Sequence, residues 1–95
     1  MGPEARLEYR VCQAVKAAGG MCVKQTGMCG MPDRLCILPG GRHIYVEMKS
    51  PHGTTTPLQR SVIRRLEQLG CDVRVVRGED ETNAFIAELG EEVMV

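Results

Sequence analysis

The feature that most constrains the fold is a polarity-alternating run that is followed by a capped helix and a valine-rich run. In residues 43–49 every second side chain is apolar, which is typical of a strand with one buried face. Thr56 and Pro57 are start signals for a helix, and Gly70 is a stop signal. Residues 72–77 favour a second strand because β-branched valines recur in them. A strand, helix and strand in this order form a right-handed crossover, so the two strands are predicted to be parallel.

A turn signal indicates that a hairpin precedes this crossover. Pro39-Gly40-Gly41-Arg42 separates the apolar run 34–38 from the run 43–49. We expect Gly40-Gly41 to form a two-residue turn, which makes these two strands antiparallel.

The remaining segments add two helices and a strand. Residues 3–18 have apolar positions at helical spacing, residues 21–25 favour a short strand, and residues 79–89 favour a helix that Gly90 ends. Residues 91–95 are then a tail or an edge strand. The predicted fold is an α/β fold of order αβββαβα, a mixed sheet of about four strands flanked by helices. The second helix is expected to bury an apolar stripe, which consists of Leu58, Val62, Ile63, Leu66 and Leu69.

Charge is distributed unevenly along the 95 residues, although the formal net charge is zero. Residues 1–78 contain all 12 Lys and Arg, and residues 79–95 contain 6 of the 12 Asp and Glu but no base. The basic body is a candidate surface for phosphate, although an Arg-rich surface without such a function fits equally well.

The chain is long enough for one domain. It has no bilayer-length apolar run and no secretory signal, so we expect a soluble, intracellular protein.

The five cysteines do not follow the pattern of a disulfide framework or a zinc site. Their number is odd, no pair has the C-x-x-C spacing, and only His43 and His52 could complete a zinc site. We interpret most of the cysteines as small core residues of a protein from a reducing compartment.

An acid and a lysine occur at the end of the run 43–49. Glu47 and Lys49 are two positions apart, so their side chains point to the same face of the sheet. Taken alone, such a pair is more often a solvated ion pair than a functional site. Asp33 opens the partner strand, where an aspartate after a proline is also common in turns.

The side on which Asp33 lies depends on the turn. With a two-residue turn, Asp33 falls opposite Met48 and its side chain points away from Glu47. A one-residue change in loop length, or a bulge, would bring it to the side of Glu47 and Lys49. Two carboxylates and a lysine at one sheet end would suit Mg²⁺, because Mg²⁺ takes oxygen ligands and needs only one or two carboxylates.

Gln59 and Glu8 are further polar residues in notable positions. Gln59 forms a capping box with Thr56, but it also lies on the sheet-facing side of its helix, over the strand end. Glu8 lies on the apolar stripe of the first helix, where an acid is costly unless it is paired or binds a metal. Glu4 is the alternative acid on this helix, nearer to its frayed end. Either carboxylate could instead point into water.

Together these residues resemble the signature of the PD-(D/E)xK nucleases. Gly30-Met31-Pro32-Asp33, Glu47-Met48-Lys49 and Gln59 are similar to the G-x-PD, E-x-K and downstream Q of the VRR-NUC (virus-type replication-repair nuclease) family. The resemblance covers roughly residues 4–78, and it includes Leu69-Gly70-Cys71-Asp72-Val73. The chain resembles the stand-alone members of phages and bacteria, which implies the cytoplasm of a bacterial cell or phage-infected host.

The resemblance implies a metal-dependent phosphodiesterase. Asp33 and Glu47 would bind Mg²⁺ or Mn²⁺, the backbone carbonyl of Met48 would add a ligand, and Glu8 would be the acid that the family places on its first helix, with a role at the metal. By the same resemblance, the catalytic Lys49 would orient or deprotonate the attacking water and help to neutralise developing charge. Gln59 would contact Lys49 or the scissile phosphate.

The function expected from this resemblance is a DNA endonuclease that is selective for branched DNA such as four-way (Holliday) junctions. Residues 1–95 would form one nuclease domain with an acidic C-terminal segment, 79–95. A homodimer is expected, because two symmetric cuts need two sites. Two alternatives remain: a restriction-type or generic resolvase nuclease of the same superfamily, and a non-catalytic nucleic-acid-binding domain. The candidates for phosphate contacts are Arg34, Arg60, Arg64 and Arg65.

Overall fold

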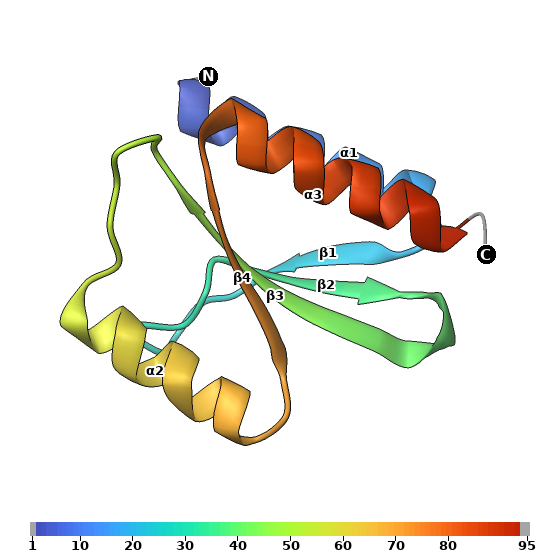
Figure 1. Ribbon diagram of the computed structural model, residues 1–95. Coiled ribbons are helices and arrows are strands. Elements are labelled where there is room, and N and C mark those ends of the chain that lie inside the picture. The colour runs from blue at the N-terminus through green and yellow to red at the C-terminus, as the bar shows by residue number, and fades with distance from the viewer. Residues whose placement is uncertain (1, 94–95) are drawn as a thin grey trace.

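A four-stranded sheet with helices on both faces forms the centre of the molecule, as the computed structural model shows (Figure 1). The backbone is described for residues 2–93, and the side chains are described for residues 2–90. The elements are α1 (Pro3–Ala17), β1 (Met21–Lys24), β2 (Arg34–Leu38), the 3₁₀ turn η1 (Pro39–Gly41), β3 (Arg42–Lys49), α2 (Pro57–Gln68), β4 (Asp72–Arg77) and α3 (Gly78–Val93). The predicted order αβββαβα and the mixed sheet are therefore confirmed.

The strands lie in the order β1-β2-β3-β4. The pairs β1–β2 and β2–β3 are antiparallel, whereas β3 and β4 are parallel and are connected through α2. The predicted hairpin and the predicted crossover are both present. Because β3 and β4 are parallel, their carboxyl ends reach the same edge of the sheet, where Lys49 pairs in register with Arg77.

The hairpin connection differs from the predicted two-residue turn. Leu38 pairs with Arg42, so three residues, Pro39–Gly41, form the connection. Gly40 and Gly41 have φ values of 84° and 80°, which side chains with a Cβ rarely adopt. The additional loop residue shifts the register by one position. The expectation that Asp33 lies opposite Met48 is therefore wrong, and continuation of the observed register places Asp33 opposite Glu47.

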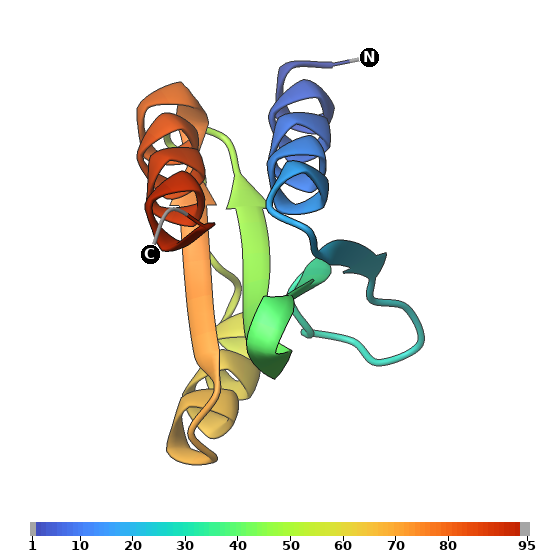
Figure 2. The same ribbon diagram turned by 90° about the vertical axis from the view of Figure 1, so that its right-hand side faces the viewer.

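Helices α1 and α3 pack side by side over one face of the sheet (Figure 2). Alternate residues of β3 point toward them: Ile44, Val46 and Met48 are at most 1% exposed. The rest of this core comes from both helices and the neighbouring strands, and it consists of Leu7, Val11, Val15, Ala18, Cys36, Leu38, Val76, Phe85 and Leu89. Its burial supplies most of the hydrophobic stabilisation of the fold.

Helix α2 lies on the opposite face and does not bury the apolar stripe that its sequence predicts. None of its residues is fully buried, and Leu58 and Leu69 are 52% and 62% exposed. The reason is its position: α2 contacts β4 and the loop before β2 instead of lying across the middle of the sheet, as Figure 1 shows. Thr56 and Gln59 form the predicted capping box at its start.

Helix α3 begins at Gly78 and continues past Gly90 to Val93, so the predicted stop at Gly90 is wrong. A glycine that ends a helix needs a positive φ, which Gly90 does not have. Residues 91–93 are therefore helical, and neither a tail nor an edge strand, while residues 94–95 lie outside the described residues.

Within the described part of the chain, no helix is long and apolar enough to cross a membrane.

Candidate active site

The shifted register brings the backbone of Asp33 to the side chain of Glu47. The Asp33 N–H donates a hydrogen bond of 3.1 Å to Oε1 of Glu47. Asp33 also closes the loop that connects β1 to β2, because its carbonyl accepts a 2.8 Å hydrogen bond from the Gln25 N–H. The β3 carboxylate therefore fixes the loop end that carries Asp33.

Gly30 holds the same loop against α2. A Cβ on Gly30 would lie 2.9 Å from Cγ of Leu58 and 3.0 Å from Cγ2 of Val62, and its φ of +85° favours glycine in addition. The glycine of the G-x-PD pattern therefore permits a close approach of the loop to α2. The loop between β1 and β2 is anchored on both sides of Pro32, which is itself buried.

Glu47 is the central group of the site and is 3% exposed. Its Oε2 atom lies 3.2 Å from Nζ of Lys49 and accepts a 3.3 Å hydrogen bond from Nε2 of Gln59. The side-chain carbonyl of Gln59 accepts a hydrogen bond from the Thr56 N–H, so the capping box also orients the amide toward Glu47. The interpretation of Gln59 as a cap and its interpretation as a site residue are thus compatible. Its observed partner is Glu47, however, and not Lys49.

The two carboxylates destabilise each other's charged forms. Burial raises the pKa of Glu47 above its usual value, and the charge of Asp33 raises it further. Burial is also the main cause that raises the pKa of Asp33, and the second cause is the charge of Glu8. The Met48 backbone N–H and Lys49 lower the pKa of Asp33 and only partly offset this rise.

This donor set fits a hard divalent cation. Glu47 provides a buried carboxylate and Asp33 a half-buried one, and Met48 lies between Glu47 and Lys49, where its carbonyl can add an oxygen. Among the described residues, no group of three or more His, Cys, Asp or Glu side chains is arranged to hold a metal ion. A cation here would therefore be held by two carboxylates, and Mg²⁺ commonly completes such a shell with water and phosphate.

Glu8 is part-buried and is paired with Arg34. Its Oε2 atom lies 3.0 Å from Nη2 and 3.3 Å from Nε of Arg34. The pair lies close enough to Asp33 for the charge of Glu8 to raise the pKa of Asp33. Glu4 is exposed in the first turn of α1. Of the two helix acids, Glu8 is thus the one near the strand end, and Arg34, a predicted phosphate contact, is bonded to it.

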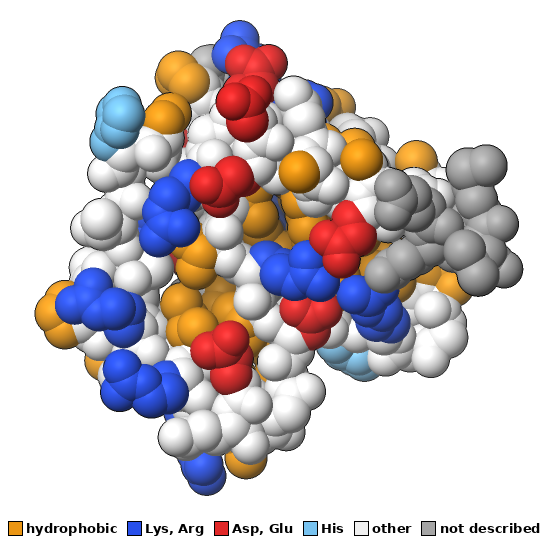
Figure 3. Space-filling view, viewed as in Figure 1, with side chains coloured by type: hydrophobic (Ala, Val, Ile, Leu, Met, Phe, Trp, Pro, Cys, Tyr) orange, Lys and Arg blue, Asp and Glu red, His pale blue; other side chains and the backbone are white. Residues whose placement is uncertain are grey.

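The other predicted phosphate contacts are exposed on α2. Arg60 and Arg64 line a groove of about 310 Å³ between α2 and β4, whereas Arg65 does not. Figure 3 shows Lys and Arg side chains gathered over the α2 region.

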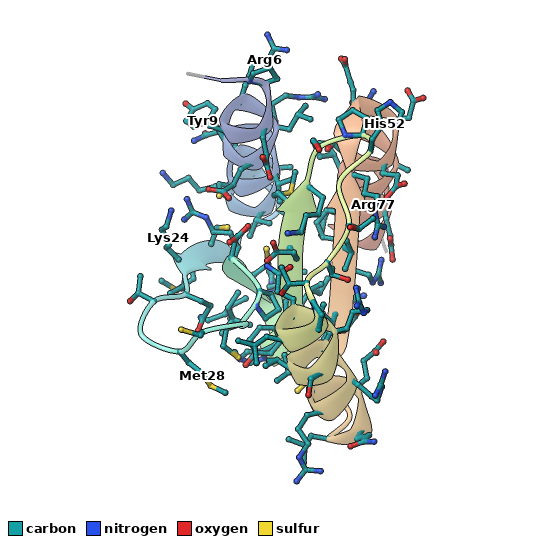
Figure 4. All side chains as sticks on the ribbon, turned by 90° about the vertical axis from the view of Figure 1, so that its left-hand side faces the viewer. Arg6, Tyr9, Lys24, Met28, His52 and Arg77 are labelled. Carbon is teal, nitrogen blue, oxygen red and sulfur yellow. The ribbon has the colours of Figure 1, made fainter. Side chains whose placement is uncertain are left out.

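The sequence interpretation missed Arg77. It lines the same groove, pairs in register with Lys49, and donates a 2.9 Å hydrogen bond from Nε to the Gly53 carbonyl. In Figure 4 Arg77 lies beside the connection between β3 and α2, on the other side of β3 from Lys24. The predicted parallel pairing contained the signal for this residue, because it places the last residues of both strands at one sheet edge.

Comparisons with known proteins agree with this arrangement. A family model described as the VRR-NUC domain matches residues 5–80. A protein named "Putative nuclease p44" from Acyrthosiphon pisum secondary endosymbiont phage 1 is 38% identical over 79 residues, which cover 81% of this chain and 85% of the phage protein. A solved structure titled "VRR_NUC domain" has a TM-score of 0.85 at 29% identity and covers 92% of this chain and 97% of that chain. A second, titled "VRR_NUC domain protein", shares the fold with a TM-score of 0.70 at 18% identity over 96% of this chain and 90% of its own.

Proposed function

The chain belongs to the VRR-NUC family, and from this premise we propose that it is a metal-dependent nuclease that hydrolyses phosphodiester bonds in DNA. One observation carries the proposal: the buried carboxylate of Glu47 contacts the Asp33 N–H, Lys49 and Gln59 at a single strand end. A purely structural role would not explain why two acids with raised pKa values share this place, because buried like charges cost stability.

Asp33, Glu47 and the carbonyl of Met48 are proposed to hold Mg²⁺ or Mn²⁺. When bound, such an ion polarises the scissile phosphate and lowers the pKa of a coordinated water. Gln59 is a positioning residue, because its amide holds Oε2 of Glu47 while its own carbonyl is held by the helix start. Glu8 has a more distant role, since Arg34 binds its carboxylate.

Lys49 is proposed to donate hydrogen bonds to the attacking water and to the phosphate oxygens. Its Nζ is held at the site by Glu47, and its side chain is 17% exposed, so it stays in partial contact with solvent. Positive charge in a partly dehydrated site stabilises the extra negative charge of the transition state more than that of the ground state. Arg60, Arg64 and Arg77 would bind the flanking phosphates of the same strand.

Branched DNA is the proposed substrate, and a homodimer is the proposed assembly. Two sites related by a two-fold axis would supply the paired cuts that a four-way junction requires. A nuclease of restriction type, or another resolvase of the superfamily, is the second candidate, since the same strand end would serve duplex DNA. A non-catalytic DNA-binding domain is less consistent with the buried charges at the strand end.

The function is tested with purified protein against single-stranded, duplex, flap and four-way junction DNA. We expect cleavage with Mg²⁺ or Mn²⁺, greatest on the junction, and no cleavage after EDTA is added. Cleavage that persists in EDTA would contradict the metal site, and equal rates on duplex and junction would favour the restriction-type alternative. Binding of all substrates without cleavage would support the non-catalytic domain.

Lys49→Ala separates a catalytic role from simple phosphate binding. We expect the single-turnover rate to fall about 100-fold or more, while the dissociation constant for DNA changes only a few-fold. Arg64→Ala is the matched control in the groove, and it should weaken binding without a comparable loss of rate. Equal losses of binding and rate in Lys49→Ala would indicate a phosphate clamp.

The dimer is tested by light scattering on the same preparation. We expect the mass of two chains at the concentration used for cleavage. The mass of one chain, together with full cleavage of the junction, would rule the homodimer out.

A further inference from the structure

Three cysteines from three different elements meet near the Glu8–Arg34 pair. Sγ of Cys12 on α1 lies 2.9 Å from Sγ of Cys22 on β1, and Sγ of Cys22 lies 3.9 Å from Sγ of Cys36 on β2. Cys22 and Cys36 are opposite each other in the β1–β2 register. The thiols are therefore grouped by the fold, although their spacing in the sequence gives no sign of it.

The three thiols differ in access. Cys12 and Cys22 line a partly open cavity of about 410 Å³ between α1 and β1, which Glu8 and Arg34 also line. Cys36 belongs to the hydrophobic core and is 0% exposed. A small reagent in this cavity can therefore reach the first two sulfurs, and the third is covered by the sheet and the helices.

We propose that Cys12 and Cys22 are a thiol modification site at which a small-molecule disulfide oxidises the pair to a reversible intramolecular disulfide. The sulfurs need only a small approach to reach the bond length of about 2.05 Å. This proposal does not rest on the proposed nuclease function, because the sulfurs bond to one another and not to Asp33, Glu47 or Lys49.

The oxidation proceeds by two exchange steps. Cys12 loses its proton and its Sγ attacks one sulfur of the reagent. The reagent S–S bond breaks, and the first thiol leaves with a proton. Sγ of Cys22, after losing its own proton, attacks Sγ of Cys12, and the second thiol leaves with a proton. The protein gains one S–S bond, and the reagent is reduced to two thiols.

The thiol form is the resting form of this pair. Burial raises the pKa of Cys12 to about 12, and the hydrogen bond with Cys36 together with burial raises the pKa of Cys22, although the hydrogen bond with Cys12 lowers it. Both thiols are therefore protonated at neutral pH. Because the thiolate is the reactive form, their thiol–disulfide exchange is slow compared with that of an ordinary exposed cysteine. A long exposure to an oxidising thiol pool is needed to form the bond, which is consistent with cysteines that stay reduced under normal conditions.

The disulfide would join α1 to β1 directly beside the acid of the candidate site. Cys12 follows Glu8 by about one helical turn, so the two lie on the same face of α1. Cys36 follows Arg34 by two strand positions, so these two lie on the same face of β2. Oxidation would therefore fix the part of α1 that carries Glu8 against the sheet.

The test incubates the full folded chain with oxidised glutathione in a Cys29→Ser, Cys71→Ser background, which removes the other two thiols. Free thiols, including the covered Cys36, are blocked while the chain is unfolded at acid pH, where thiols exchange slowly, and peptides are mapped without reductant. We expect a Cys12–Cys22 crosslink, a loss of two hydrogens in mass, and a rise in Tm of roughly 10 °C that reductant reverses. Cys36→Ala should keep the crosslink, and Cys12→Ser should abolish it together with the rise in Tm.

Three outcomes would overturn the proposal. They are the absence of any crosslink after prolonged oxidation, a crosslink between Cys22 and Cys36, and an unchanged rise in Tm in Cys12→Ser. Each readout is obtained without DNA or metal, so failure here leaves the nuclease proposal untouched. Failure of DNA cleavage likewise leaves the thiol pair untouched.

Discussion

The two faces of β3 differ in what they bury. Ile44, Val46 and Met48 point toward α1 and α3 into an apolar core, whereas Glu47 and Lys49 point toward α2. On the first face, called the closed face below, α1 and α3 bury these three β3 residues, but on the second face α2 has no fully buried residue. The closed face therefore provides stability, and the α2 face carries the polar groups of the candidate site.

The difference explains how a small domain can keep two repelling acids at a site where one is buried and the other half-buried. Burial and mutual repulsion disfavour the charges of Asp33 and Glu47, so both groups cost stability in the absence of a cation. The apolar core of the opposite face offsets this cost. A trade of stability for activity is common at functional sites, and it predicts opposite responses to mutation on the two faces.

Truncation of a core residue should give the largest loss of stability. Ile44→Ala removes a side chain that is 1% exposed, and we expect the free energy of unfolding to fall by about 3 kcal/mol. Leu58→Ala on α2 is the control, with an expected loss below about 1 kcal/mol because Leu58 is 52% exposed. Urea denaturation measures both changes, and similar losses would mean that α2 packs as tightly as the closed face.

Gly30→Ala should have the next largest effect, because it strains the contact between the loop and α2. The added Cβ meets Leu58 and Val62 and also requires an unfavourable φ, so we expect a loss of about 2–3 kcal/mol. Gly27→Ala in the same loop is the matched control: its φ is +97°, but its Cβ would meet no atom within 4 Å, so about 1 kcal/mol is expected. An equal loss in the two variants would show that the packing on α2 contributes nothing.

The smallest effect concerns the rim of the closed face, where Arg74 binds Asp72 at 2.7 Å and Glu88 at 2.7 Å. Hydrogen bonds from Arg74 hold the pKa values of both carboxyls below their usual ranges. Their contribution to stability is therefore present above the unfolded pKa values, near 4, and is lost as the pH falls through the folded ones. The free energy of unfolding of wild type should fall between about pH 5 and 3, and in Arg74→Met this fall should be smaller. The difference is expected to be less than about 1 kcal/mol, because the groups are partly exposed.

The measurement is thermal unfolding across this pH range, with Arg65→Met as the exposed control on α2. An Arg74→Met curve that is parallel to the wild-type curve would contradict a role for these ion pairs in acid stability. A parallel shift in the control is expected, because Arg65 is exposed on α2 and takes no part in the ion pairs of Arg74 with Asp72 and Glu88.

The local elements were predictable from the sequence because their signals are local. Polarity alternation in residues 43–49, the cap at Thr56 and the valines of β4 each specify an element without knowledge of its neighbours. The hairpin register was not predictable, because Gly40-Gly41 is compatible with both a two-residue and a three-residue connection. That single loop residue decides whether Asp33 lies opposite Met48 or opposite Glu47, and therefore on which face of the sheet its side chain lies.

The misjudged features depend on packing between distant elements. Helical periodicity predicts that α2 has an apolar stripe, but only the position of α2 at the sheet edge shows that the stripe stays half exposed. The sequence placed Gln59 over the strand end of Glu47 and Lys49, but only the structure shows that Glu47 is its partner. The meeting of Cys12 with Cys22 joins segments whose spacing in the sequence carries no such information. Sequence reasoning therefore proposed the candidate site residues by motif, and the structure supplied their contacts.

The central claim is that the α2 face trades stability for cleavage, and Asp33→Asn tests it most directly. The substitution removes one of the repelling charges and keeps an oxygen that can accept from the Met48 N–H. Metal-dependent cleavage and metal-free unfolding are measured on the same preparation, with Asp80→Asn, exposed on α3, as the control. We predict that Asp33→Asn lowers the cleavage rate by about 1,000-fold or more while its free energy of unfolding stays equal to or rises above that of wild type. Full cleavage by Asp33→Asn, or a loss of stability as large as that of Ile44→Ala, would contradict the account.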